Sequence, residues 1–373
     1  MKFCFKPFLF LICCMGFLAS CNTKKEVTLV AEKNSITKPK NIILLVGDGM
    51  GLSQVSASQF YKNSKSNFER FPIIGLIKTS SASELITDSA SSATAFASGI
   101  KTYNGALGVN LDTTSVKTIV EEISEIGIST GIISTSSIIH ATPAAFYTHT
   151  KKRSMAEDIA SQLVTSRIDF FAGGGSDYFT NREDNRDLIL ELEEKNFIMN
   201  LNSLPTGITT DFSKKQGYLL APKGLPKILE GRGNFLSDAT TLALDYLSTN
   251  ENGFFLMIEG AQIDWGGHDN DADYLISELI DFDNTIGVVL DFAESNKETL
   301  VIVTADHETG GFTLGQENGD YNKIKPVFST TGHSATMVPV FTSGPNARLF
   351  GGIYENTAIY DKMKSLFFKN NEN

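Results

Sequence analysis

The chain has 373 residues, of which 41% are apolar and 20% are charged, and its formal net charge is −11. These proportions are ordinary for a folded globular protein with one or two hydrophobic cores, and they exclude an extended disordered chain. The acidic excess argues against a nucleic-acid partner, which would need a basic surface. If the ligand is an anion, the positive charge that binds it must come from groups within the binding site, because the chain as a whole is acidic.

The first twenty residues have the pattern of an export signal. Lys2 and Lys6 precede the apolar run PFLFLICCMGFLA, which is short for a membrane span and typical of a signal-peptide core. The run ends in LASC, a bacterial lipobox pattern in which the chain is cut before Cys21 and lipid is attached to its sulfur. An ordinary secretory signal with a chance cysteine is the alternative. We predict a lipoprotein signal peptide over 1–20 and an exported, membrane-anchored protein, periplasmic or at the cell surface.

The other cysteines, Cys4, Cys13 and Cys14, lie inside that signal, so the mature chain would keep no thiol for a disulfide or a metal. Residues 21–39 are polar and poorly patterned, as expected of a tether. No internal repeat is found, and a single domain is predicted over 40–373. That length exceeds the usual single core and therefore favours a large sheet.

From residue 41 onward, short apolar runs alternate with helical spacing. Strands are predicted at 41–47, 131–137, 169–174, 253–259, 299–305 and 337–344. Helices are predicted over 154–164, 234–248 and 271–293, where a Ser or Asp can cap each start. This alternation predicts an α/β fold, with a mainly parallel central sheet and helices on both faces. Sites in such sheets lie at the carboxyl ends of the strands.

Potential metal ligands stand where three of these strands stop. Asp48 follows the first strand, Glu259 ends the fourth, and Asp306 and His307 follow the fifth. One carboxylate at a strand end is often only a helix cap, but repetition of the pattern indicates a site.

Three of the five histidines lie beside Asp or Gly-rich turns, which suits zinc ligands better than buried packing. Asp264 and His268 are four residues apart, so in a helix both could face one ion, although the glycines between them are equally compatible with a loop. His149 has no Asp or Gly-rich turn beside it and is interpreted as a structural residue. Ligands of Asp, Glu and His without Cys favour zinc, with Mg²⁺ as a further ion.

Six blocks of the sequence resemble the alkaline phosphatase family, in that family's order. They are NIILLVGDGMG, TDSASSATAFASGIKTYNGALGV, HATPAAFYTHTKKRS, IEGAQIDWGGHDND, TADHETGGF and TGHSATMVPVFTSGP, and they span about 41–345. TDSASSATA alone is moderately specific, whereas six blocks in order are highly specific. The chain is most like the compact, secreted bacterial members, which include cold-active enzymes. The resemblance implies that family's fold and a phosphomonoester hydrolase that releases inorganic phosphate and an alcohol.

Carried over position by position, the resemblance implies two zinc ions and one magnesium ion. The first zinc would be held by Asp264, His268 and His333, the second by Asp48, Asp306 and His307, and the magnesium by Asp48, Thr142 and Glu259. His140 would act through water beside the magnesium, and Arg153 would clamp the phosphate. Without the resemblance, Arg153 reads as part of a solvated basic face with Lys151 and Lys152.

The stretch LITDSASSATAFASG, residues 85–99, holds few bulky side chains. The resemblance implies that Ser89 is the nucleophile and forms a phosphoserine. A serine hydroxyl is a weak nucleophile, so a zinc ion at Ser89 would be needed to hold it as an alkoxide. We expect Asp88 to cap a helix whose first turn contains Ser89, with its N–H groups toward a phosphate, and Gly99 to end that helix.

Two positions depart from the best-known bacterial form of the family. Trp265 and His140 stand where that form has Lys and Asp, which puts its magnesium site and water network in doubt here. Only 25 residues separate His307 from His333, so a crown-like insertion there is short or absent and a homodimer is left undecided. The segment FAGGGSDYF lacks the Lys and Ser/Thr of a phosphate-binding loop and is interpreted as a strand end and turn.

Two further functions stay open. A phosphodiesterase or sulfatase of the same superfamily would share the metal ligands, but Ser89 with Arg153 favours monoesters, because a guanidinium fork fits a dianion with free oxygens. A lipid-anchored, non-catalytic phosphate-binding protein is the alternative from another class. The expected partners are small phosphomonoesters, inorganic phosphate as product inhibitor, and a membrane through the lipid anchor.

Overall fold

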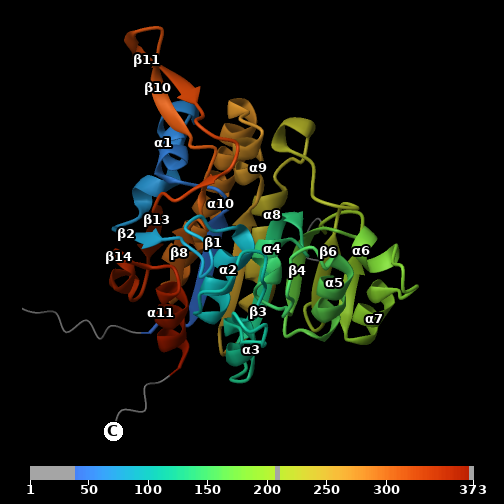
Figure 1. The fold of residues 1–373 in the computed structure, drawn as a ribbon. Helices are drawn as coiled ribbons and strands as arrows, with labels where there is room; N and C mark the ends of the chain where they lie inside the picture. Colours follow the sequence, from blue (N-terminus) through green and yellow to red (C-terminus); the bar gives the residue numbers. More distant parts are fainter. Residues whose placement is uncertain (1–37, 206–210, 369–373) are drawn as a thin grey trace, which may run out of the picture. The chain divides into compact units, whose positions relative to one another are not determined.

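The computed structural model describes residues 38–205 and 211–368 (Figure 1). The predicted signal peptide, Cys21 and the predicted tether up to residue 37 lie outside these residues. Within the described part of the chain, no helix is both long enough and apolar enough to cross a membrane.

The main sheet has ten strands in the described residues. In spatial order they are β14 (Gly352–Glu355), β2 (Ile73–Lys78), β13 (Val338–Ser343), β8 (Thr299–Thr304), β1 (Asn41–Gly47), β7 (Phe254–Gly260), β3 (Ser129–Ser137), β4 (Phe170–Gly174), β6 (Lys215–Leu219) and β5 (Phe197–Asn200). All neighbours pair in parallel except β13, which runs antiparallel to both β2 and β8. The predicted, mainly parallel α/β sheet is therefore confirmed.

Eleven α-helices connect and cover the strands that the structure describes. They are α1 (Leu52–Tyr61), α2 (Ser89–Ser98), α3 (Ile119–Ser124), α4 (Ala141–Ala144), α5 (Ala156–Thr165), α6 (Asp177–Thr180), α7 (Leu188–Glu194), α8 (Phe235–Leu247), α9 (Gln262–His268), α10 (Ala272–Asn296) and α11 (Ala358–Phe367). Three 3₁₀ turns span Asn67–Arg70, Ile228–Glu230 and Ala347–Phe350. In Figure 1, α2, α4 and α11 lie in front of the sheet, and α8 and α10 lie behind it.

The central strand β1 shows why the sheet forms where it does. Its residues, NIILLVG, are all buried, because helices cover both faces of a parallel sheet and leave no room for polar alternation. All six predicted strands are present, within two residues at each end. The three predicted helices correspond to α5, α8 and α10.

The predicted caps hold for only one of those three helices. Asp271 caps α10 by accepting a hydrogen bond from the Tyr274 N–H. By contrast, α5 begins after Met155 and α8 after Asn234, and neither residue makes a side-chain cap. The backbone of Asn234 is not extended there, with φ −87° and ψ 26°, so the cap geometry is lost.

The chain between His307 and His333 leaves the main sheet and returns. It contains the antiparallel hairpin of β10 (Thr313–Glu317) and β11 (Asp320–Val327). The two ends of this excursion pair as β9 (Glu308–Thr309) and β12 (His333–Ser334), an antiparallel ladder of two residue pairs. The predicted turn after β4 is also present, ahead of α6.

Candidate active site

The site lies at the carboxyl ends of three neighbouring strands. In the sheet, β1 is flanked by β7 and β8, and Val46 is in register with Glu259 on one side and Thr304 on the other. Asp48 follows β1, and Asp306 and His307 follow β8. The sheet topology therefore brings together four side chains from three segments that are far apart in the sequence.

The first group of possible metal ligands is Asp264, His268 and His333. Residues 262–268 form helix α9, so Asp264 and His268 lie one turn apart, with 3.4 Å between Oδ2 and Nε2. The Nε2 atom of His333 lies 3.7 Å from Asp264 Oδ1 and 3.2 Å from His268 Nε2. The helical alternative for this segment is thus the one that the structure has.

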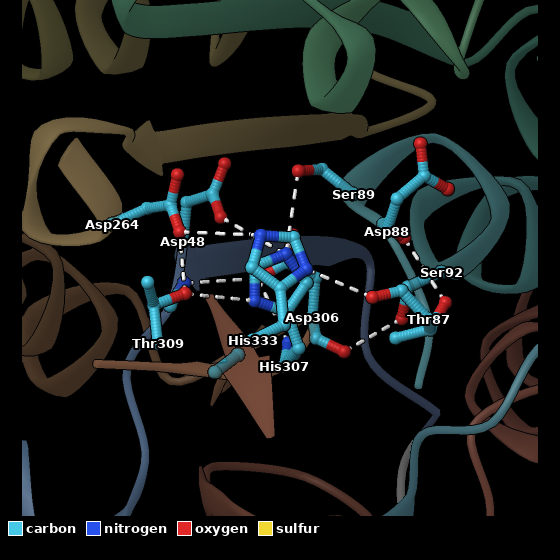
Figure 2. A network of polar contacts seen from close by, with 12 residues as sticks. Asp48, Thr87, Asp88, Ser89, Ser92, Asp264, Asp306, His307, Thr309 and His333 are labelled. Carbon is cyan, nitrogen blue, oxygen red and sulfur yellow. Dashed lines mark hydrogen bonds and ion pairs between the residues drawn. The ribbon is translucent and has the colours of Figure 1, made fainter. Parts of the chain in front are cut away.

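The second group is Asp48, Asp306 and His307, whose side chains are completely buried. His307 Nε2 lies 3.2 Å from Asp306 Oδ2 and 3.5 Å from Asp48 Oδ1. The rings of His307 and His333 stack with centroids 3.5 Å apart, so the two groups are adjacent (Figure 2).

The outer nitrogens of these three histidines fix their protonation. Backbone carbonyls, which only accept, lie 2.6 Å from His268 Nδ1 and 2.8 Å from His333 Nδ1. Thr309 donates its hydroxyl hydrogen to Asp264 Oδ1 at 2.5 Å, so at 3.2 Å it accepts from His307 Nδ1. Each Nδ1 therefore carries a hydrogen, and each Nε2 faces carboxylates, where the neutral form of the ring has its lone pair. This is how metal-ligating histidines are usually held.

The third group is Asp48, His140 and Glu259. The Thr142 hydroxyl, Glu259 Oε1 and both Asp48 carboxylate oxygens are buried without a hydrogen-bond partner in the described residues. Four polar atoms in that state are rare in a folded protein unless a water or an ion completes them. The oxygen-rich composition suits magnesium.

His140 also contacts Arg153, whose Nη2 lies 3.2 Å from its Nε2. A guanidinium only donates hydrogen bonds, so His140 Nε2 accepts and the ring hydrogen lies on Nδ1. Burial, helped by the Arg153 charge, lowers the pKa of His140 to about 4 and keeps the ring neutral. With its lone pair already engaged, His140 fits a role through water better than direct ligation.

The carboxylates of the site repel one another in the absence of a cation. Burial and the nearby Asp306 raise the pKa of Asp48 well above its ordinary value. Burial also raises the pKa of Glu259 to about 7, against the hydrogen bond from Ser134. A hydrogen bond with Asp264 raises the pKa of His268 to about 9. Bound divalent cations would remove this repulsion, so the residues present fit metal ions.

Ser89 is the first residue of α2 and is 2% exposed. Asp88 caps the helix by accepting from the Ser91 N–H, and Gly99 ends it in the left-handed region, with φ 70°, which confirms both expectations. The Ser89 hydroxyl lies 3.3 Å from His307 Nε2 (Figure 2). The helix therefore presents Ser89 to the second group of ligands.

Arg153 turns into the site, while Lys151 and Lys152 next to it are exposed. Its Nη1 lies 3.2 Å from Asp88 Oδ2 and 3.5 Å from Ser89 Oγ. Its backbone N–H donates to Gly105 O at 2.7 Å, which fixes the loop. In the structure, Arg153 thus lies apart from the solvated basic face that the sequence alone suggested.

Trp265 and several unpredicted residues complete the surroundings. The Trp265 ring stands edge-on to His140, with centroids 6.0 Å apart. Sequence reasoning missed Thr309, described above, and Ser134, which donates to Glu259 Oε2. Thr309 lies in the TADHETGG block, two residues after His307. This closeness to a predicted ligand is the sequence feature that could have identified it as a site residue.

Comparisons with known proteins show the family of the chain. The family model for alkaline phosphatase matches residues 39–326. Alkaline phosphatase 4 of Bacillus subtilis is 37% identical over 369 residues, and the match covers 92% of this chain and 77% of that protein.

Solved structures are similar over the same region. The alkaline phosphatase from the Antarctic bacterium TAB5 is 52% identical, with a TM-score of 0.86, over 89% of this chain and 99% of that one. A histidine-to-aspartate mutant of the TAB5 enzyme, with Mg bound in the M3 site, is 51% identical, with a TM-score of 0.86, over 89% and 98% of the two chains.

Proposed function

Because this chain belongs to the alkaline phosphatase family, we propose that it hydrolyses small phosphomonoesters through a phosphoserine at Ser89, with metal ions bound beside that residue. Family and fold support phosphomonoester hydrolysis. The observation that carries the finer proposal is the position of the Ser89 hydroxyl. It lies between the Nε2 atom of His307 and the guanidinium of Arg153.

Three groups of side chains would hold the ions. We propose zinc at Asp264, His268 and His333, zinc at Asp48, Asp306, His307 and Ser89, and magnesium at Asp48, Thr142 and Glu259. The inward lone pairs of the three histidines support zinc, and the unpartnered oxygens support magnesium. The Mg bound to the TAB5 mutant supports a magnesium site in this fold. When bound, the ions supply positive charge beside the serine oxygen and the phosphoryl group.

Ser89 would attack the phosphorus atom, its hydroxyl proton passing to water as Oγ bonds to phosphorus. The bond from phosphorus to the alcohol oxygen breaks in the same step, and that oxygen takes a proton from water. The start of α2 would assist, because the positive end of the helix lies at Ser89, where negative charge develops. Asp88 holds the N-terminus of α2 in position, because its carboxylate accepts hydrogen bonds from the N–H groups of Ser91 and Gly105, each at 3.0 Å.

Arg153 would hold two nonbridging phosphate oxygens with its fork of N–H donors. Contacts to Asp88 through Nη1 and to His140 through Nη2 fix the plane of the guanidinium before the substrate arrives. A guanidinium has five N–H donors, so enough remain for the phosphate. A water molecule would then attack the phosphorus atom, the bond from Ser89 Oγ to phosphorus would break, and Oγ would regain a proton from that water. Inorganic phosphate leaves, and because it offers Arg153 the same nonbridging oxygens, it would inhibit as product.

The test compares p-nitrophenyl phosphate with the bis ester and with p-nitrophenyl sulfate, while zinc and magnesium are counted on the same sample. We expect the monoester to be hydrolysed fastest, by protein with about two zinc ions and one magnesium ion per chain. Faster turnover of the diester or the sulfate would favour the superfamily alternative. Phosphate binding without any turnover would favour a binding protein.

For the location of the protein, we propose export and attachment to a membrane by lipid on Cys21. The lipobox pattern LASC after an apolar signal core supports this proposal. Such an anchor would place the site outside the cytoplasm, where phosphomonoesters of the surroundings reach it.

A further inference from the structure

His333 lies on a poorly buried part of the chain. None of residues 329–337 is buried, whereas Asp48, Asp264 and His307 are nearly or fully enclosed. The segment lies between the β10–β11 hairpin and β13, and none of its own residues belongs to the main sheet. A metal ligand needs a fixed position, and something other than core packing must supply it here.

Glu308 provides the side-chain anchor. It is 4% exposed, and its Oε2 accepts a hydrogen bond from the hydroxyl of Ser334, the residue after His333. Glu308 and Ser334 are also paired in the short β9–β12 ladder, next to the pair formed by Thr309 and His333. The contact thus ties the strand that carries His333 to the strand that follows His307.

The other oxygen of Glu308 fixes the carboxylate itself. Its Oε1 accepts from Gln54 Nε2 at 2.8 Å and from the Phe312 N–H at 3.0 Å. Gln54 is a buried residue of α1 and also donates to Thr309 O at 2.9 Å. All three donors to Glu308 are uncharged. A buried carboxylate held only by neutral donors is costly, so its retention calls for a role.

We propose that Glu308 is a positioning residue for His333, and through it for the zinc that Asp264, His268 and His333 would hold. The inference rests on the proposed function, since it assumes zinc in that group. Glu308 does not touch the ion. It fixes the backbone of His333 through Ser334, and Thr87 O then sets the ring tautomer by accepting from His333 Nδ1 at 2.8 Å.

The test measures zinc and magnesium binding separately. Metal-free protein is titrated with zinc against a competing chelator, in the presence of magnesium, and both bound metals are counted. Ser334→Ala and Glu308→Ala should bind one of the two zinc ions roughly 10- to 100-fold more weakly, with magnesium unchanged. Glu308→Gln keeps the size of the side chain and can donate to the Ser334 oxygen, so it should restore part of the lost affinity.

Ser329→Ala is the matched control. Ser329 lies on the same exposed segment, but its hydroxyl donates to Gly311 O at 3.2 Å and does not contact Glu308. It should bind zinc like the wild type. Activity is measured as well. At saturating zinc, kcat of Ser334→Ala should return to near the wild-type value, because the substitution lowers zinc affinity without changing the structure of the zinc-bound site.

Three outcomes would overturn the inference. Wild-type zinc affinity in both Ser334→Ala and Glu308→Ala would remove the positioning role while leaving the proposed function intact. Joint loss of zinc and magnesium that excess zinc does not repair would show a general structural role. A wild-type protein that binds no zinc would refute the proposed function, and the inference with it.

Discussion

The small residues around Ser89 let its helix lie inside the protein. All ten residues of α2 are buried, and two of its hydroxyls donate to the backbone of neighbouring segments. Ser92 donates to Asp306 O at 2.8 Å and Thr94 to Ala106 O at 3.1 Å. Larger side chains would push the helix away from the strand ends. The composition of this stretch therefore keeps the Ser89 hydroxyl within reach of His307.

Replacing Ser89 tests the proposed nucleophile. Ser89→Ala removes the oxygen that would form the phosphoserine, so turnover of p-nitrophenyl phosphate should fall on the order of 10³-fold or more. Ser98→Ala is the control, because this serine is on the same helix and its buried hydroxyl has no partner in the described residues. Metal content must match in both variants. Wild-type turnover in metal-replete Ser89→Ala would remove Ser89 from the mechanism.

Replacing Arg153 tests the phosphate clamp. Arg153→Ala removes charged hydrogen bonds worth about 1.5–3 kcal/mol, so KM should rise roughly 10-fold or more and inhibition by phosphate should weaken. The phosphoserine should still be trappable at acid pH. Lys152→Ala, the exposed neighbour, should leave both constants near their wild-type values. Unchanged phosphate inhibition in Arg153→Ala would reassign the residue.

The sequence predicted the positions of the ligands better than their surroundings. Asp48, Glu259 and His307 could be found because each stands at or just past the end of an apolar strand. Arg153 came from the family resemblance, since its own neighbours are lysines. Glu308 was missed because its role depends on a pairing with Ser334, which lies 26 residues further along the chain. Local patterns do not report such pairings.

At the scale of elements, the six strands in the middle of the main sheet were predicted, whereas the two outermost strands at each end, β14 and β2 and β6 and β5, were not. Each of the six predicted strands contains a short apolar run, which is longest in strands such as 41–47. The strands β5 and β14 lie at the two edges of the sheet, are four residues long and are only partly buried, so they give little hydrophobic signal. The two-residue pairing of β9 with β12 is also too short for any periodicity.

Helix α3 is joined to the loop that carries Arg153 by His149. Its Nε2 lies 3.1 Å from Glu121 Oε1 and its Nδ1 lies 2.7 Å from Gly108 O. Both partners are acceptors, so the contacts favour the doubly protonated ring. Glu121 also completes the capping box of α3 with Thr118. This fits the structural role predicted for His149.

This pair predicts a pH dependence of stability. The hydrogen bond to Glu121 raises the pKa of His149 above its unfolded value of about 6.5. The stabilisation is therefore full below pH 6.5 and is lost as the pH rises through the folded pKa. Chemical unfolding across this range should show the wild type more stable than His149→Gln, by roughly 1 kcal/mol or less at the low end, and the difference should vanish at high pH.

A constant difference between the two proteins at every pH would contradict that assignment. The unfolding measurements should avoid acid pH, where Glu121 itself becomes protonated. The pKa of Glu121 is lowered in the folded protein, so its own contribution changes only in that acid range. Burial raises it, but the hydrogen bonds from His149 and Thr118 outweigh burial, so Glu121 loses its contribution only as the pH falls through its own folded value.

At the scale of the whole molecule, the acidic surface and the anionic substrate need not conflict. The net charge is −11, yet Arg153 and the proposed ions would place positive charge where the phosphate binds. Lys151 and Lys152 add to it at the surface next to Arg153.

The anchor predicted at Cys21 is testable on the full chain. Cys21→Ser should move the protein from the membrane fraction to the soluble fraction, with its phosphatase activity unchanged, because the lipid would be attached outside the catalytic domain. Fractionation with an activity assay in each fraction measures this. Unchanged partitioning would favour an ordinary signal or an uncut segment.

Trp265 is the only tryptophan among the 373 residues. Its ring stands edge-on to His140, a residue of the site, and packs closely on Gly224, where a Cβ would lie only 2.8 Å from Cη2. Indole emission from the unlabelled protein therefore comes from this one place. Fluorescence titrations with metals or phosphate would thus follow the filling of the site directly, without an attached dye.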